Sequence, residues 1–255
     1  MMTGSGPDTS AIAASEPMSR AKRHGAAALL ACVALPAHGE WHGAVSFATD
    51  YFYRGYSKSR GNPVAQASLS YAHDSGGYAG LDFSQVGFDD QCEADHAQVE
   101  FKPYLGWALP LSPEWRAELA ASGYVYDGHV FGQDSNYSEV YASLHFRDLL
   151  TARFAWAPDA YQRGADILDY EIQGRYDLMD NLRFSAGLGY YQSGSLLEYN
   201  SFYWNAGLTW YPHLNISADL RYVDSDAHAY PQGHPGQFNP RSVVGEALFT
   251  ISVGF

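Results

Sequence analysis

From about residue 44 to its end, the sequence alternates between apolar and polar positions with a period of two. The final segment shows this most clearly, because every second residue counted back from the last one is apolar. These residues are Phe255, Val253, Ile251, Phe249 and Ala247. The residues between them include Glu246, Thr250 and Ser252, which favour water. This period is typical of a β-strand with one apolar and one polar face.

Twelve segments of this kind can be delimited in the sequence. They span residues 44–54, 65–71, 79–84, 98–107, 115–125, 139–146, 151–156, 168–176, 182–190, 202–210, 216–222 and 246–255. Short links and longer loops alternate between them, with five short links and six longer loops. An even-stranded, up-and-down membrane barrel with both termini on the periplasmic side has this arrangement of connections. We therefore predict an all-β, closed, antiparallel transmembrane β-barrel of about twelve strands.

The alternative is a soluble barrel or sandwich, in which the apolar faces point inward. Twelve strands enclose more space than these side chains can readily fill, which favours apolar faces that point outward to lipid. Aromatic residues also concentrate near the strand ends, as in the girdles of membrane proteins. These residues are Tyr51, Tyr53, Trp107, Trp115, Trp156, Trp210 and Tyr222. The terminal Phe255 resembles the signal that the bacterial outer-membrane insertion machinery reads.

The N-terminal part has the features of a secretory signal peptide. Basic residues at 20–23 precede a short apolar run at 26–37, followed by small residues. We predict a signal peptide over residues 1–39, with the true start at Met18, and a barrel domain over residues 40–255. Cys32 stands in a faint lipoprotein-like context. Cleavage leaves Cys92 as the single cysteine, so no intramolecular disulfide is possible.

The overall charge is strongly acidic. Residues 40–255 hold 12 Lys and Arg against 26 Asp and Glu, a net charge of −14. Nucleic acid is therefore excluded as a partner of this surface. The mean hydropathy of −0.28 also argues against a helical membrane bundle. The expected partners are outer-membrane lipid and lipopolysaccharide, the barrel-assembly machinery and small solutes, and the expected state is a monomer or a homotrimer.

The polar faces of the predicted strands supply a set of charged residues that would line the lumen. The candidates are Asp50, Arg54, Asp82, Glu100, Lys102, Arg116, Glu118, Arg153, Arg175, Arg183, Asp219 and Arg221. Four further acids complete these faces, namely Glu139, Asp169, Glu171 and Glu246. Arg54 is the sharpest candidate, with Asp50 four residues earlier on the same face. It would be either a constriction charge or half of a structural ion pair with Asp50 that holds the first strand in register.

Nine acids and seven bases give the predicted lumen a charge near balance, so most of the negative charge lies in loops and turns. Arginine beside carboxylates suits bidentate pairs in a confined space. A pore crossed by such pairs should conduct weakly, with a mild preference for cations at its acidic mouth. A channel for acidic sugars would need a basic lumen, which this sequence lacks.

Residues 50–65 resemble the N-terminal signature of the TorF family of porins. The segment has Asp50 before aromatic residues, then Arg54-Gly55, Ser57-Lys58-Ser59 and Pro63. Residues 71–81 continue the likeness, and Tyr56 departs from it where the family commonly has an aliphatic residue. The resemblance is specific over residues 45–90 and looser to Phe255. It implies an outer-membrane channel for small polar solutes, without catalytic residues and with no assigned solute.

Parts of the sequence are also compatible with three other functions. The run from Asp89 to His96 could bind a divalent cation, but its spacing matches no established metal site, and neither a metal nor another cofactor is predicted. A lipid hydrolase would need a His, a Ser and an orienting group on the barrel wall, and the histidines lack such a pattern, so no enzyme is predicted. A structural or adhesive barrel would have its lumen filled by Tyr104, Tyr124, Tyr126, Tyr191 and Tyr203 together with arginines.

Overall fold

The structure is a computed structural model, and it describes residues 39–88, 95–227 and 237–255. Several predictions fall outside the described residues. These are the signal peptide, the start at Met18, the lipoprotein-like Cys32, the single Cys92 and the acidic run at 89–94 that precedes Asp95.

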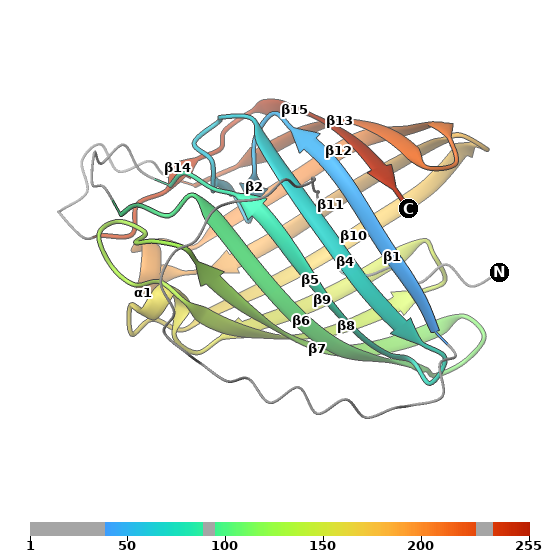
Figure 1. Cartoon of the computed structure of the whole chain (residues 1–255), viewed down its shortest axis with the longest axis horizontal. Coiled ribbons are helices and arrows are strands. Elements are labelled where there is room, and N and C mark those ends of the chain that lie inside the picture. The colour runs from blue at the N-terminus through green and yellow to red at the C-terminus, as the bar shows by residue number, and fades with distance from the viewer. Residues whose placement is uncertain (1–38, 89–94, 228–236) are drawn as a thin grey trace, which may run out of the picture.

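Twelve antiparallel strands form a closed barrel, as predicted (Figure 1). The strands are β1 (Gly39–Ala48), β4 (Val64–His73), β5 (Gly77–Gln85), β6 (Val99–Pro110), β7 (Trp115–Tyr126), β8 (Tyr137–Phe146), β9 (Leu150–Ala157), β10 (Ile167–Met179), β11 (Leu182–Gln192), β12 (Ser201–His213), β13 (Ile216–Ser225) and β15 (Glu246–Gly254). Each strand pairs with its neighbour in the chain, so the topology is an up-and-down meander. Within the described residues, no helix is long and apolar enough to cross a lipid bilayer.

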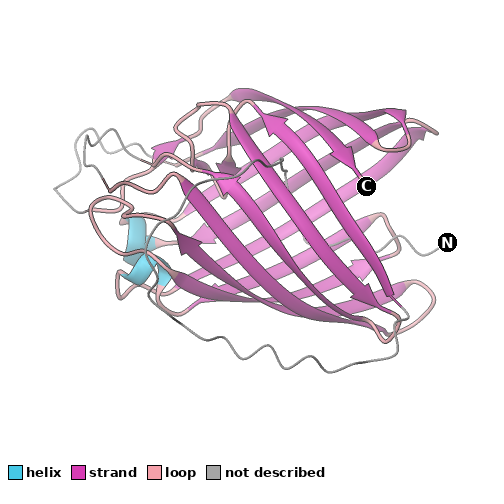
Figure 2. Ribbon diagram, in the orientation of Figure 1, coloured by secondary structure: helices cyan, strands magenta, loops and turns pink. Residues whose placement is uncertain are grey.

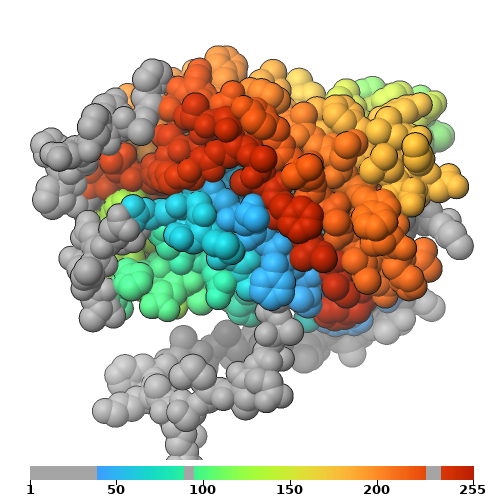
Figure 3. Space-filling model, turned by 90° about the horizontal axis from the view of Figure 1, so that it is seen from above, coloured from blue at the N-terminus to red at the C-terminus, as the bar shows by residue number. Residues whose placement is uncertain are grey.

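The first and last strands close the barrel. Val45 of β1 pairs with Val253 of β15, and Phe47 pairs with Ile251. Two backbone hydrogen bonds between Gly43 and Phe255, of 2.8 and 2.9 Å, extend this pairing to the last residue. Figure 3 shows residues of the two chain ends, blue and red, side by side on the outer surface. Closure leaves no unpaired sheet edge, which is what a barrel facing lipid requires.

The two ends of the barrel differ. Five short turns connect strands at one end, and six longer connections join them at the other (Figure 1). The only helical turns in the described part of the chain, η1 (Ala160–Gln162) and α1 (Gly194–Leu197), belong to the long connections (Figure 2). Gly39 pairs with His73 and Gly254 bonds to Asn215, so the first described residue and the C-terminus both lie at the short-turn end. The predicted alternation of connections is confirmed.

The predicted faces of the strands are also confirmed over most of the barrel. Apolar residues point outward, as the exposed fractions of Phe47 (58%), Leu119 (60%) and Ile172 (57%) show. Four of the predicted girdle tryptophans lie on this outer surface, namely Trp107, Trp115, Trp156 and Trp210. Alternate residues point into the lumen and are polar, because the pleat sends successive side chains to opposite faces of the sheet.

The predicted first strand over residues 44–54 is wrong beyond Ala48. Residues 49–63, which we call the inward segment, leave the wall and fold into the barrel. The chain reverses at Arg54 and Gly55, whose φ angles are 48° and 94°. The reversal pairs β2 (Phe52–Tyr53) with β3 (Tyr56–Ser57), and β14 (Arg241–Ser242) joins them as a third short strand. Tyr51 and Tyr53 therefore lie inside the barrel and not in an outer girdle.

Candidate functional site

Asp50 fixes the inward segment. Its carboxylate accepts hydrogen bonds from the hydroxyl groups of Ser57 and Ser59, the latter at 2.6 Å, and from the backbone N–H of Gly61 at 3.2 Å. Arg241 of β14 lies 3.5 Å from the other carboxylate oxygen. The side chain is almost fully buried. Asp50 therefore stabilises the fold of the inward segment. It does not pair with Arg54, so the ion pair that a continuous first strand predicts is absent.

Because the chain reverses at Arg54, the side chain of this residue reaches two carboxylates of the barrel wall. Its Nη1 donates to Glu139 Oε1 at 2.6 Å, and its Nε lies 3.2 Å from Asp169 Oδ2. All three side chains are buried, and the guanidinium also lies over the rings of Tyr53 and Tyr191, at 4.7 and 5.5 Å from their centroids. Arg54 thus lies inside the barrel, where its partners are Glu139 and Asp169.

Lys58 lies among the buried charged groups of the barrel, although the sequence pattern does not single it out. Its ammonium lies 2.5 Å from Glu100 Oε2 and is completely buried. The rings of Tyr53 and Tyr124 lie 4.0 and 4.7 Å from the same nitrogen. Burial lowers the pKa of Lys58 to about 8, although the Glu100 carboxylate opposes this shift. The sequence gives no signal for this burial, because a basic residue between two serines, as in Ser57-Lys58-Ser59, is typical of an exposed loop.

Aromatic residues fill the barrel at the long-connection end. Tyr56 of the inward segment shares a 2.8 Å hydrogen bond with Tyr161 of η1, whose ring packs 4.1 Å from that of Phe238. This aromatic cluster also includes Phe88, Tyr124, Tyr126, Phe131, Tyr137, Tyr191 and Tyr203. Four of the five tyrosines predicted to fill the lumen belong to it. The fifth, Tyr104, is buried and lines the cavity described next.

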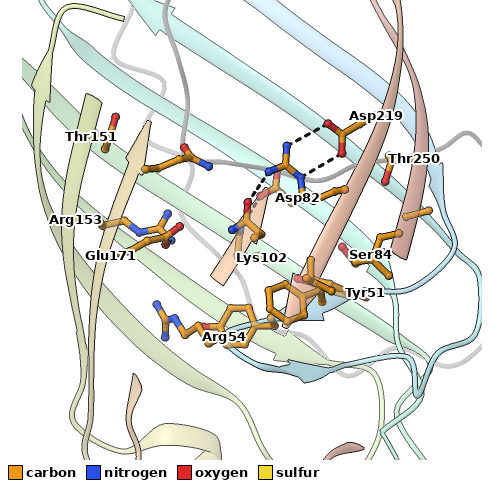
Figure 4. Close-up of a pocket in the computed structure, with 18 of the residues that line it drawn as sticks. Tyr51, Arg54, Asp82, Ser84, Lys102, Thr151, Arg153, Glu171, Asp219 and Thr250 are labelled. Atoms are coloured by element: carbon orange, nitrogen blue, oxygen red, sulfur yellow. Dashed lines mark hydrogen bonds and ion pairs between the residues drawn. The ribbon is translucent and has the colours of Figure 1, made fainter. Parts of the chain in front are cut away.

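A cavity of about 490 Å³ lies between the inward segment and the short-turn end (Figure 4). In this view, Arg153 and Glu171 lie together on one wall, away from Ser84 and Thr250, while Tyr51 and Arg54 belong to the inward segment. Most of the predicted pore-lining residues contribute to it. These are Asp50, Arg54, Asp82, Glu100, Lys102, Glu118, Arg153, Arg175, Asp219 and Arg221. The lining of the cavity thus holds six carboxylates and five basic side chains.

Opposite charges are paired on the cavity wall, either between neighbouring strands or along one strand. Lys102 lies 3.0 Å from Asp82, and Arg153 is paired with Glu171. Arg221 lies 3.1 Å from Asp219 and also donates to Asn205 and Ser185. These pairs leave the wall nearly neutral and fill part of the lumen with extended side chains. In contrast, the Arg175 guanidinium makes no hydrogen bond or ion pair with any residue that the structure describes.

Two predicted pore-lining residues do not line this cavity. Arg183 lies at the short-turn rim, where its Nε donates to Asp177 at 2.6 Å. Arg116 opposes His145 near the same end of the barrel and is absent from the cavity lining. The alternation of apolar and polar residues predicts that both side chains belong to the polar face, but it does not indicate how far along the barrel axis each residue lies.

A histidine of the wall has a carboxylate and a hydroxyl as neighbours. His145 Nδ1 lies 3.0 Å from Thr151 Oγ1, and its Nε2 lies 3.6 Å from Glu118 Oε2. Both partners line the cavity, so the group faces the lumen and not the lipid side. In the described part of the chain, no three His, Cys, Asp or Glu residues are arranged to hold a metal ion.

The chain belongs to a bacterial family described as "Bacterial protein of unknown function (Gcw_chp)", whose family model matches residues 37–253. No curated protein matches the sequence. Among solved structures, the chain is similar to a KdgM porin, with a TM-score of 0.52 and 9% identity over 84% of this chain and 98% of the other. It is also similar to a NanC porin, with a TM-score of 0.52 and 12% identity over 85% and 99%. At these identities, the likeness establishes the porin-like barrel fold.

Proposed function

We propose that this protein is an outer-membrane channel for the passive diffusion of small polar solutes, with the short turns and both chain ends on the periplasmic side. The observation that carries the proposal is the polar cavity enclosed by a closed barrel whose outer face is apolar. An apolar exterior suits lipid, and a lumen of hydroxyl groups and paired charges suits hydrated solutes. The resemblance of residues 50–65 to TorF porins supports the same function.

We further propose a mild preference for cations. The cavity wall is close to neutral, with one more carboxylate than basic groups, while residues 40–255 carry a net charge of −14. A negative mouth concentrates cations. One KdgM structure is described as a complex with disordered oligogalacturonate, an acidic sugar polymer. The paired charges of the lumen here argue against such a solute, because little uncompensated positive charge would face it.

The rest of the proposal concerns partners. Phe255 is exposed at the end of the closing strand, and we propose that the barrel-assembly machinery reads it during insertion. Lipid and lipopolysaccharide would surround the apolar outer face. The chain would act as a monomer or a homotrimer. No group in the site requires a cofactor for passive diffusion.

A second candidate function is a non-conducting structural or adhesive barrel. It is favoured by one observation, namely that the inward segment and the aromatic cluster fill the lumen at the long-connection end. A lipid hydrolase is disfavoured, because the hydroxyl and carboxylate beside His145 face the cavity and not the lipid. The channel proposal requires that solutes can pass once the inward segment shifts.

Liposome swelling tests the channel proposal against the structural barrel. The mature chain, residues 40–255, is refolded into liposomes, which are then diluted into isotonic arabinose, glycine or stachyose. A channel predicts swelling that is fast for the small solutes and slow for the tetrasaccharide. Liposomes that hold folded, heat-modifiable protein and swell no faster than empty ones would favour the structural barrel.

A further inference from the structure

Three carboxylates of the barrel wall face the inward segment at the same level of the lumen. Glu100, Glu139 and Asp169 lie within the first three residues of β6, β8 and β10, which all run from the long-connection end. Their exposed fractions are 1%, 1% and 0%. Each contacts a basic side chain of the inward segment. The wall therefore presents three buried acids to two basic groups that belong to a different part of the chain.

The wall also contributes aromatic faces beside these carboxylates. The Tyr124 ring of β7 lies 4.7 Å from the Lys58 ammonium, and the Tyr191 ring of β11 lies 5.5 Å from the Arg54 guanidinium carbon. A cation over an aromatic face is attracted by the ring quadrupole, most strongly where water is excluded. These rings belong to the wall, so they stay in place when the inward segment moves.

Hydroxyl groups of the wall orient the acids toward the lumen. Tyr126 donates to Glu100 Oε2 at 2.7 Å, and Tyr141 donates to Glu139 Oε2 at 2.6 Å. Tyr203 donates to Asp169 Oδ1 at 2.9 Å. Within the part of the chain that the structure describes, Asp169 Oδ2 accepts no hydrogen bond, and Arg54 is its ion-pair partner. One oxygen of Glu139 and one of Asp169 thus depend on a cation supplied from the lumen.

A buried carboxylate without a compensating cation is strongly unfavourable. If the inward segment withdraws, the wall keeps its acids and its rings but loses both of their cations. A solute that restores an N–H-donating positive charge would then be bound in their place. Small inorganic cations are a poorer fit, because aromatic rings favour a weakly hydrated cation. The oxygens of Glu139 and Asp169 also already contact two nitrogens of one guanidinium.

We propose that Glu100, Glu139 and Asp169, with Tyr124 and Tyr191, form a lumenal binding site for organic cations that carry an ammonium or a guanidinium group. In the structure described here, the chain occupies this site with its own Lys58 and Arg54. The inference rests on the proposed channel function and names its solute class. A permeating organic cation displaces these side chains from the wall, whereas anions meet three carboxylates and are rejected.

The test removes the internal cations and supplies external ones. Arg54→Ala/Lys58→Ala is refolded into detergent micelles, and its unfolding temperature is followed by heat-modifiable gel mobility with added methylguanidinium or n-butylammonium chloride. The expected result is a lower unfolding temperature than that of the wild type, which rises again with either organic cation and not with NaCl of equal ionic strength. Wild-type protein should respond much less at the same cation concentration, because the added cation must first displace Lys58 and Arg54.

Two further variants make the test specific. Adding Glu100→Gln, Glu139→Gln and Asp169→Asn to the double variant should abolish the response, since the acids are then gone. Arg183→Ala, which removes a rim arginine far from the three acids, should behave like the wild type. If the double variant does not fold, Lys58→Ala with n-butylammonium and Arg54→Ala with methylguanidinium replace it.

Stabilisation that NaCl reproduces, or that survives loss of the three acids, would overturn the inference. The readout needs no ionic current, so the two proposals can fail separately. A barrel that responds to the organic cations but never conducts would overturn the channel and keep the site. A barrel that conducts but ignores the cations would keep the channel and overturn the site.

Discussion

The Nη1 atom of Arg54 lies 2.6 Å from Oε1 of Glu139, although the two residues are 85 positions apart and come from different parts of the barrel. Arg54 belongs to the inward segment and Glu139 to the wall strand β8. Both side chains are buried, so the pair joins the segment to the wall at the point where the lumen is filled. This ion pair therefore holds the inward segment against the wall inside the lumen.

Replacing Arg54 tests what the pair does. Arg54→Ala leaves Glu139 and Asp169 buried without their cation, and loss of one partner of a buried pair costs about 3–5 kcal/mol. We expect a lower free energy of unfolding in urea, a larger single-channel conductance and a stronger preference for cations. Arg183→Ala, at the rim, is the matched control. Unchanged selectivity with lower stability would assign Arg54 a structural role alone.

Asp50 offers a way to loosen the inward segment without removing a lumenal cation. Asp50→Ala removes three hydrogen bonds that hold residues 57–61 and the contact with Arg241. The wall strands do not depend on these bonds, so we expect the barrel to keep its heat-modifiable fold while its conductance becomes larger and noisier. Asp177→Ala removes an exposed carboxylate and should leave the current unchanged. A conductance equal to that of the wild type in Asp50→Ala would show that the segment does not limit the current.

The pKa of Lys58 predicts a pH dependence of stability. Burial lowers this pKa from 10.5 to about 8, so between these values the unfolded chain binds one more proton at this group than the folded protein does. Stability due to Lys58 must therefore rise as the pH increases from 8 to 10.5. The charged groups that face Lys58 are Glu100, Lys102 and Arg54. Glu100 raises the pKa of Lys58, whereas Lys102 and Arg54 lower it.

The measurement compares the wild type with Lys58→Met in urea unfolding at several pH values. The methionine variant fills similar space without a titrating group. We expect the stability of the wild type, relative to the variant, to increase from pH 8 to 10.5 and to stay level below pH 8. A relative stability that falls as the pH rises would show that the ammonium is favoured in the folded protein.

A pair of neighbouring substitutions tests the face assignment of β12. Leu208 is 43% exposed on the outer face, and Leu208→Arg should impair insertion at a cost of about 2–4 kcal/mol. Thr209 points into the cavity, where its hydroxyl donates to Asp219 at 2.7 Å, so Thr209→Arg should fold normally. Folding yield in liposomes, measured by heat-modifiable mobility, distinguishes them. Exchanged phenotypes would mean that the faces are reversed.

The sequence predicts the barrel well because the alternation of apolar and polar residues is a local property of each strand. In β12 and β15 the pleat alone assigns every second side chain to one face, so composition reveals which face is apolar. The alternation of short and long connections then determines the meander and places both chain ends together. Neither inference requires knowledge of contacts between distant residues.

The lumen is less predictable, for two physical reasons. Alternation continues past Ala48 through Tyr53, so the pattern cannot reveal that Arg54 and Gly55 reverse the chain into the barrel. A period-two pattern also assigns a residue to a face without giving its depth along the barrel axis. It therefore predicts that Arg183 lines the lumen, whereas its side chain lies at the short-turn rim and pairs with Asp177. The partners of Arg54 and the burial of Lys58 follow from that reversal.

The most direct test of the account is single-channel recording from refolded residues 40–255 in a planar bilayer, with the reversal potential measured across a KCl gradient. A cation-preferring channel should give small, discrete openings and a reversal potential of the sign that mild cation preference produces. Folded, heat-modifiable protein that inserts yet stays electrically silent, in the wild type and in Asp50→Ala alike, would contradict it.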